Sequence, residues 1–149
     1  MLKQWYQRLW PFKKKDASLV KVLIIEDNRV DAKMIKKAVD VCGFTALVAY
    51  DGKTGVEMAQ KHKPNLIILD YHLPDMNGSR VLKELRSDQG TSAETVLVLT
   101  ILNQPQVIKD SFTYGADRYA IKPINVSLLA EQIQFMLGHP HEKNKGGIK

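Results

Sequence analysis

The 149-residue chain contains a single cysteine, Cys42, so no disulfide bond can form within it. No apolar run approaches the roughly 18 residues that a membrane-spanning helix needs. The basic start of the chain, with Lys3 and Arg8, is not followed by the apolar stretch and small-residue cleavage site of a secretory signal. We therefore expect a soluble, cytoplasmic protein.

The sequence also lacks internal repeats and low-complexity segments, and 44% of its residues are hydrophobic. A chain of this length and composition suits one globular domain with a real hydrophobic core. We expect a basic N-terminal extension over residues 1–19, a domain over residues 20–138 and a flexible C-terminal tail over residues 139–149.

The expected domain lacks net charge, although the whole chain carries +6. Residues 1–19 hold five basic residues against one acidic residue, and residues 139–149 hold three against one. These two ends account for all of the excess. A neutral domain gives little support to a DNA-binding face, so we expect no direct DNA binding.

Short aliphatic runs alternate along residues 20–138 with longer segments in which apolar residues recur at helical spacing. Such apolar runs are typical of parallel strands that are covered by helices on both faces and joined by right-handed crossovers. The expected fold is therefore α/β, with a doubly wound, five-stranded parallel sheet. We expect its strands at Val20–Ile25, Thr45–Tyr50, Asn65–Asp70, Thr95–Thr100 and Asp117–Lys122.

The apolar positions of the intervening segments predict five helices with one face toward the sheet. The residues that carry this spacing are Val30, Met34, Ile35, Ala38 and Val41; Gly55, Met58 and Ala59; Val81, Leu82 and Leu85; Val107, Ile108 and Phe112; and Leu128, Leu129, Ile133 and Leu137.

Reactive side chains stand where four of the expected strands end. In open parallel sheets ligands bind beyond the carboxyl ends of the strands, so these side chains are expected to converge on one edge. They are Glu26 and Asp27 after the first strand, Asp70 at the third, Thr100 at the fourth and Lys122 at the fifth. A plainer interpretation is an acidic edge that Lys122 neutralises internally.

Three carboxylates that lie close together raise one another's pKa unless a cation is present, and oxygen ligands suit Mg²⁺. Lys122 and Thr100 would offer a charge and a hydroxyl group to an incoming phosphoryl group. Asp70 would then be the nucleophile that forms an acyl phosphate.

Four segments of the chain carry a resemblance to a known family: IIEDN at residues 24–28, LDYHLPDMNG at 69–78, LT at 99–100 and GADRYAIKP at 115–123. Over about residues 20–137 the sequence resembles the response-regulator receiver family, the phosphoacceptor modules of two-component signalling. The resemblance implies a flavodoxin-like receiver fold and Mg²⁺ as the cofactor. It also implies a histidine kinase or phosphotransfer protein as phosphodonor, and a downstream protein partner.

The resemblance further implies a role for each residue at the expected edge, and a cis peptide bond between Lys122 and Pro123. The implied roles are Asp70 as phosphoacceptor; Glu26, Asp27, Asp70 and the backbone carbonyl of His72 as magnesium ligands; Lys122 as the phosphate-pairing lysine; Thr100 as the switch hydroxyl; and Tyr119 as the aromatic residue whose rotamer reports activation.

Two positions depart from the common pattern of the family. His72 stands where methionine is frequent, and it is either an exposed loop residue or one that influences phosphate hydrolysis. Ile101 follows Thr100 where the family often has a small residue, and its bulk would narrow access to Asp70.

The N-terminal segment predicts a short amphipathic helix. Leu2, Trp5, Tyr6 and Leu9 recur at helical spacing, with basic and amide residues between them, and Pro11 is expected to end the helix. Three roles stay open: packing on its own domain or on a second copy in a homodimer, docking to a partner, or contact of residues 1–15 with a membrane surface.

We expect a stand-alone receiver that signals by phosphorylation-controlled docking and is not an enzyme, because neither end of the chain is long enough for an output domain. Two alternatives remain. One is a receiver-like interaction module that works without phosphorylation, which Ile101 keeps open. The other is a phosphohydrolase with Asp70 as nucleophile. Enzymes of the haloacid-dehalogenase type require a second acid two residues after the nucleophile, where this chain has His72.

Overall fold

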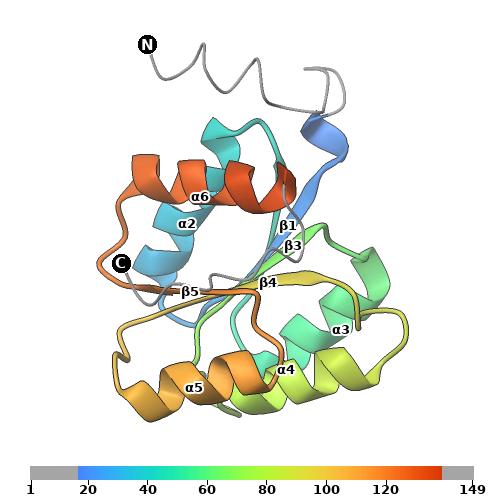
Figure 1. The fold of residues 1–149 in the computed structure, drawn as a ribbon. Helices are drawn as coiled ribbons and strands as arrows, with labels where there is room; N and C mark the ends of the chain where they lie inside the picture. Colours follow the sequence, from blue (N-terminus) through green and yellow to red (C-terminus); the bar gives the residue numbers. More distant parts are fainter. Residues whose placement is uncertain (1–16, 139–149) are drawn as a thin grey trace.

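The computed structural model describes residues 17–138, so the expected N-terminal helix and C-terminal tail lie outside the described residues. A single five-stranded parallel sheet runs through the described part, in the order β2-β1-β3-β4-β5 (Figure 1). The predicted doubly wound, flavodoxin-like fold is confirmed. The strands are β1 (Lys21–Ile25), β2 (Thr45–Ala49), β3 (Leu66–Leu69), β4 (Thr95–Thr100) and β5 (Arg118–Ile121), one residue shorter at one or both ends than predicted for all but β4.

Helices cover both faces of the sheet. The helices α2 (Arg29–Val41) and α6 (Val126–Gly138) lie on one face, whereas α3 (Gly52–His62), α4 (Gly78–Ser87) and α5 (Pro105–Thr113) lie on the other (Figure 1). A short 3-10 turn, η1 (Ala17–Leu19), precedes β1. Within residues 17–138 no helix has the length and apolarity to cross a membrane.

Local signals in the sequence fix where the helices begin. The side chains of Asn28, Asp51 and Asn77 accept hydrogen bonds from backbone N–H groups in the first turns of α2, α3 and α4. These bonds satisfy donors that have no partner within the helix. Pro105 occupies the first turn of α5, where its missing N–H group costs nothing.

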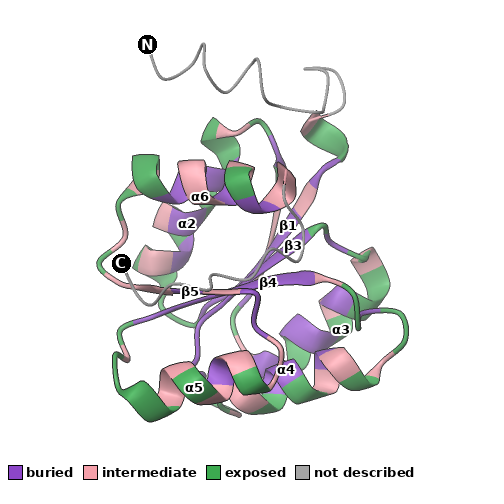
Figure 2. Cartoon of the chain, viewed as in Figure 1, coloured by how far each residue is buried: buried purple, intermediate pink, exposed green. Residues whose placement is uncertain are grey.

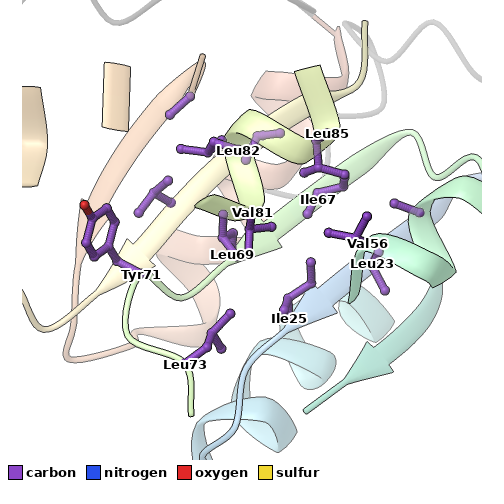
Figure 3. Packing of buried hydrophobic residues seen from close by; sticks show 14 of the residues in the cluster. Leu23, Ile25, Val56, Ile67, Leu69, Tyr71, Leu73, Val81, Leu82 and Leu85 are labelled. Carbon is purple, nitrogen blue, oxygen red and sulfur yellow. The ribbon is translucent and has the colours of Figure 1, made fainter. Parts of the chain in front are cut away.

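The core consists of two apolar layers, one on each face of the sheet (Figure 2). Alternate residues of β1 point to opposite layers: Leu23 and Ile25 pack toward α3 and α4, whereas Ile24 packs toward α2 and α6. Figure 3 shows the first of these layers, in which Val81, Leu82 and other side chains of α4 contact the sheet. Burial on both faces explains why β1 and β3 read as continuous aliphatic runs.

The predicted inward faces of two helices were partly wrong. Val30, Val41 and Leu128 are each at least 60% exposed. Val30 and Val41 lie in the first and last turns of α2, and the face that packs on the sheet is made instead by Ala32, Ile35, Ala38 and Val39. Both valines lie outside this face and are exposed to solvent.

Candidate functional site

Three carboxylates meet at the carboxyl ends of β1 and β3. These strands are neighbours in register, with Ile25 paired to Leu69, so the residues that follow them lie side by side. The backbone N–H of Asp70 donates to the carbonyl of Ile25 at 2.9 Å, which fixes Asp70 at the sheet edge. One carboxylate oxygen from each of Glu26, Asp27 and Asp70 lies within 4.8 Å of the others. Glu26 is 1% exposed, whereas Asp27 faces solvent.

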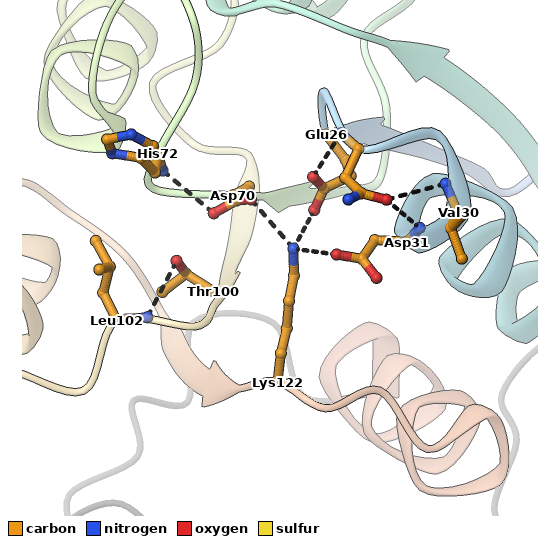
Figure 4. Close-up of polar contacts among 9 residues, drawn as sticks. Glu26, Val30, Asp31, Asp70, His72, Thr100, Leu102 and Lys122 are labelled. Carbon is orange, nitrogen blue, oxygen red and sulfur yellow. Dashed lines mark hydrogen bonds and ion pairs between the residues drawn. The ribbon is translucent and has the colours of Figure 1, made fainter.

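Lys122 inserts its ammonium group among these acids from the end of β5 (Figure 4). Its Nζ lies 2.6 Å from Glu26 Oε2, 2.8 Å from Asp31 Oδ2 and 3.1 Å from Asp70 Oδ2. An ammonium group has three N–H donors, so these three contacts engage all of them. The Lys122 side chain is 7% exposed, and the Lys122–Pro123 peptide bond is cis, as the resemblance implied.

Asp31 is the residue of this site that sequence reasoning missed. It lies in the first turn of α2, where its backbone N–H donates to the Asn28 cap at 3.0 Å. Its position one helical turn after Asp27, in a helix that begins at the functional edge, was the signal that would have found it. Unlike the other acids of the site, Asp31 does not follow the end of a strand but lies within a helix.

Burial governs the ionisation of the group. It raises the pKa of Glu26 to about 7, against the hydrogen bonds that the Lys122 ammonium and the Asn28 backbone donate to it. Burial alone would lower the pKa of Lys122, but its bonds to Asp31 and Glu26 and the charge of Asp70 raise it overall. The lysine therefore stays charged, and Glu26, Asp31 and Asp70 share its one ammonium group.

Thr100 and Tyr119 occupy the neighbouring part of the edge. The Thr100 hydroxyl is fully buried and accepts a hydrogen bond from the backbone N–H of Leu102 at 3.4 Å. The Tyr119 side chain is also buried, and its hydroxyl donates to the backbone carbonyl of Leu102. Burial, followed by the nearby Tyr71 and Asp70, raises the pKa of Tyr119 to about 12. The segment after β4 thus contacts both predicted switch residues.

The segment after Asp70 turns sharply into α4. The backbone N–H of His72 donates to Asp70 Oδ1 at 3.2 Å, while its side chain is exposed. Gly78 N–H donates to the carbonyl of Tyr71 at 2.6 Å, and a Cβ atom at Gly78 would lie 2.8 Å from Tyr71 Cα. Only glycine permits this approach without a shift of the backbone. Ile101 is exposed directly after Thr100.

The donor set fits a hard divalent cation. Glu26, Asp27 and Asp70 supply only oxygen atoms, and the single ammonium group nearby leaves most of their charge without compensation. Oxygen ligands with an excess of negative charge are what Mg²⁺ binds, usually through one or two carboxylates and several waters.

A doubly wound α/β sheet with an acidic pocket, a buried lysine and a buried threonine at its carboxyl edge defines the receiver class of signalling domains. The family described as "Response regulator receiver domain" matches residues 22–134, and the chain belongs to this family. Proteins of the family are phosphoacceptors of two-component signalling, and they generally bind Mg²⁺ at an acidic pocket and interact with histidine kinases or phosphotransfer proteins.

Several curated proteins are similar to the chain. The response regulator ArlR of Staphylococcus saprophyticus is 31% identical over 88% of this chain and 58% of its own length. The DNA-binding dual master transcriptional regulator RpaA of Synechocystis is 33% identical over 78% of this chain and 48% of its own length. The polar-differentiation response regulator DivK of Brucella anthropi is 28% identical over 78% of this chain and 95% of its own length. The chain thus spans about half the length of ArlR and RpaA.

Solved structures share the fold. The chemotaxis response regulator CheY4 of Vibrio cholerae superposes with a TM-score of 0.73, at 27% identity over 78% of this chain and 97% of that one. A two-component response regulator of Clostridium difficile gives a TM-score of 0.75, at 25% identity over 80% and 97% of the two chains.

Proposed function

We propose that Asp70 accepts a phosphoryl group and that the phosphorylated domain signals by docking to another protein. The proposal rests on the position of the Asp70 carboxylate, which lies 3.1 Å from the Lys122 ammonium and within 4.8 Å of an oxygen of both Glu26 and Asp27 at the carboxyl edge of the sheet. An acid held there as a mere helix cap would not require a buried lysine 52 residues away in the sequence.

The proposed step is an in-line displacement. A carboxylate oxygen of Asp70 donates an electron pair to phosphorus, and the bond from phosphorus to the nitrogen of a phosphohistidine, or to the oxygen of a small phosphodonor, breaks. The leaving group keeps that electron pair. Glu26, Asp27, Asp70 and the backbone carbonyl of His72 would hold Mg²⁺, which supplies positive charge to the phosphoryl oxygens.

The other residues of the edge complete the proposal. Lys122 directs its ammonium group to a phosphoryl oxygen. Thr100 rotates its hydroxyl toward another phosphoryl oxygen and so releases the backbone N–H of Leu102. Because Tyr119 also bonds to Leu102, movement of this segment would change the surroundings of the tyrosine ring. Movement of the segment after β4 would thereby transmit phosphorylation of Asp70 to the surface of the domain.

Protein docking is the output that the charge distribution favours. RpaA is named as DNA-binding, and ArlR and RpaA each extend well beyond the part that this chain matches, whereas DivK is matched over almost all of its length. Residues 20–138 carry no net charge, which favours a protein partner over a nucleic-acid duplex. The histidine kinase or phosphotransfer protein would be the upstream partner.

Acetyl phosphate with Mg²⁺ is expected to add one phosphoryl group to the wild-type protein and none to Asp70→Asn. Intact-mass spectrometry measures the addition. Asp40→Asn is the matched control, because Asp40 is an exposed acid of α2 whose carboxylate, among residues 17–138, forms an i, i+4 ion pair with Lys36. A wild-type protein without added mass would contradict the proposal, as would equal addition to Asp70→Asn. Multiple turnover of phosphate esters would instead identify a phosphohydrolase.

Asp27→Ala is expected to weaken Mg²⁺ binding at least about tenfold, because it removes a carboxylate from a group of three that no other described residue replaces. Isothermal calorimetry is the suitable measurement. Tryptophan fluorescence is less suitable, because both tryptophans, Trp5 and Trp10, lie outside the described residues. Asp40→Ala controls for the loss of one negative charge on the neighbouring helix. Wild-type affinity in Asp27→Ala would remove Asp27 from the site.

A further inference from the structure

Asp31 has no place in the mechanism proposed above, yet it makes one of the shortest ion pairs of the site. Its Oδ2 atom lies 2.8 Å from Lys122 Nζ, closer than the Oδ2 atom of Asp70 at 3.1 Å. Asp31 is not one of the three acids whose oxygens lie close enough together to share a cation. Its charge is therefore directed at the lysine.

We propose that Asp31 is a positioning residue that holds the Lys122 ammonium group while Asp70 is unphosphorylated. The free energy needed to break this ion pair then opposes phosphorylation. The inference rests on the proposed function of Asp70 as phosphoacceptor. Asp31 thereby sets how readily Asp70 gains and keeps a phosphoryl group.

The three partners of Lys122 differ in what they lose when the ammonium group moves. Glu26 is 1% exposed, so an unpaired Glu26 carboxylate would stay buried at a large desolvation cost. Asp70 is the acceptor itself, and its phosphoryl oxygens would attract the ammonium group further. Asp31 is 28% exposed, so water can solvate its carboxylate after the pair breaks. Asp31 is the partner that Lys122 can give up.

The backbone holds Asp31 where its carboxylate competes with the phosphoryl oxygens for the Lys122 ammonium group. It stands in the first turn of α2, and the Asn28 side chain accepts hydrogen bonds from the N–H groups of Val30 and Asp31, both at 3.0 Å. The helix begins at this cap, so the Asp31 carboxylate is presented to the ammonium group from a fixed element (Figure 4). Aspartate also has a short side chain with few rotatable bonds, so it loses little side-chain entropy when it forms an ion pair.

The test compares Asp31→Asn with wild type and with Asp40→Asn, which removes the same charge from an exposed site on α2. With Mg²⁺ present, the half-saturating concentration of beryllofluoride, a phosphoryl mimic, is measured by NMR for each protein. Asp31→Asn is expected to lower it by about three- to tenfold, the effect of removing one competing partner of a charged hydrogen bond. Asp40→Asn is expected to leave it unchanged, and Asp31→Glu to restore a value near wild type.

A second readout needs neither metal nor phosphoryl group. The ¹⁵Nζ resonance of Lys122 in the metal-free protein is expected to shift in Asp31→Asn and to stay at its wild-type position in Asp40→Asn. Asp31→Ala gives the same comparison with a side chain that cannot accept a hydrogen bond. The melting temperature of each variant identifies any that does not fold. Either Asp31→Asn or Asp31→Ala alone is enough for the comparison with wild type.

Two results would overturn the inference. One is a half-saturating concentration in Asp31→Asn that equals the Asp40→Asn value, and the other is a higher concentration, which would mean that Asp31 helps the lysine to reach the phosphoryl group. In both cases the proposed function stands as long as wild-type protein binds beryllofluoride and gains phosphoryl mass. Wild-type protein that does neither would remove the proposed function, and the inference with it.

Discussion

Lys122→Met is expected to lower the free energy of unfolding by about 3 kcal/mol at pH 8, because it leaves buried carboxylates without the ammonium group that compensates them. The lysine lies within 3.1 Å of Glu26, Asp31 and Asp70, and Glu26 is almost completely buried. Methionine keeps most of the aliphatic side chain, so the loss reports the charge. Phosphoryl uptake by Asp70 is expected to disappear in the same variant, since the lysine would pair the phosphoryl oxygens.

The cost of Lys122→Met is expected to shrink as the pH falls. Burial already raises the pKa of Glu26 to about 7 in the presence of the lysine, and loss of the ammonium group raises it further. When the pKa of a carboxyl group is higher in the folded than in the unfolded protein, the free energy of unfolding is larger at low pH than at high pH. The difference is lost as the pH rises through the folded pKa. Denaturant unfolding at pH 5 and pH 8 measures the difference.

Lys36→Met is the matched control for that experiment. Lys36 pairs with Asp40 on the surface of α2 at 2.8 Å, and both side chains are about half exposed. Such a pair contributes less than about 0.5 kcal/mol. If Lys122→Met were as stable as Lys36→Met at pH 8, the Lys122 ammonium would not be the group that compensates the buried acids.

The sequence predicted the sheet and most of the site because both follow from residues at strand ends. Runs such as Leu66–Leu69 are buried on both faces and indicate a central strand without further information. Parallel strands bring their carboxyl ends to one edge, so Glu26, Asp70 and Lys122 were expected to meet there, and the structure brings them together. The roles given to these residues stay predictions.

Contacts that depend on how a helix is rotated were beyond the sequence. Periodicity alone did not identify the buried face of α2, because that face includes the small Ala32 and Ala38, and the exposed valines Val30 and Val41 also fit helical apolar spacing. The same rotation decides that Asp31 points at Lys122. Arg86 was missed for a related reason, since most of its partners are backbone carbonyls, which leave no pattern in the side chains.

Arg86→Ala is expected to lower the free energy of unfolding by about 3–5 kcal/mol, because one largely buried guanidinium group ties three segments together. From the last turn of α4 it donates to the carbonyl of Gly115 at 2.6 Å and to that of Glu94 at 2.7 Å, and it pairs with Asp117 at 3.3 Å. Arg86→Lys is expected to recover only part of the loss, because an ammonium group cannot reproduce the planar set of donors.

The exposed arginine of the same helix is the control for Arg86. Arg80 pairs with Glu84 at 3.2 Å in an i, i+4 ion pair on the surface, so Arg80→Ala is expected to cost less than about 0.5 kcal/mol. Both variants lose one positive charge from α4, and only Arg86→Ala loses the backbone contacts. Equal denaturant midpoints for the two variants would show that the network around Arg86 contributes nothing beyond charge.

The loss in Arg86→Ala is also expected to depend on pH through Glu94. Burial raises the pKa of Glu94 to about 7, against the positive charges of Lys63 and Arg86. Without Arg86 the folded pKa of Glu94 rises further above its unfolded value, so the variant loses additional stability as the pH rises through 7. At pH 5 Glu94 is largely protonated in the folded state, and most of this additional loss is absent. Unfolding curves at pH 5 and pH 8 would therefore separate two contributions to the loss of stability. The loss that persists at pH 5 arises mainly from the hydrogen bonds to the backbone carbonyls of Gly115 and Glu94. The additional loss at pH 8 arises from the Glu94 carboxyl group.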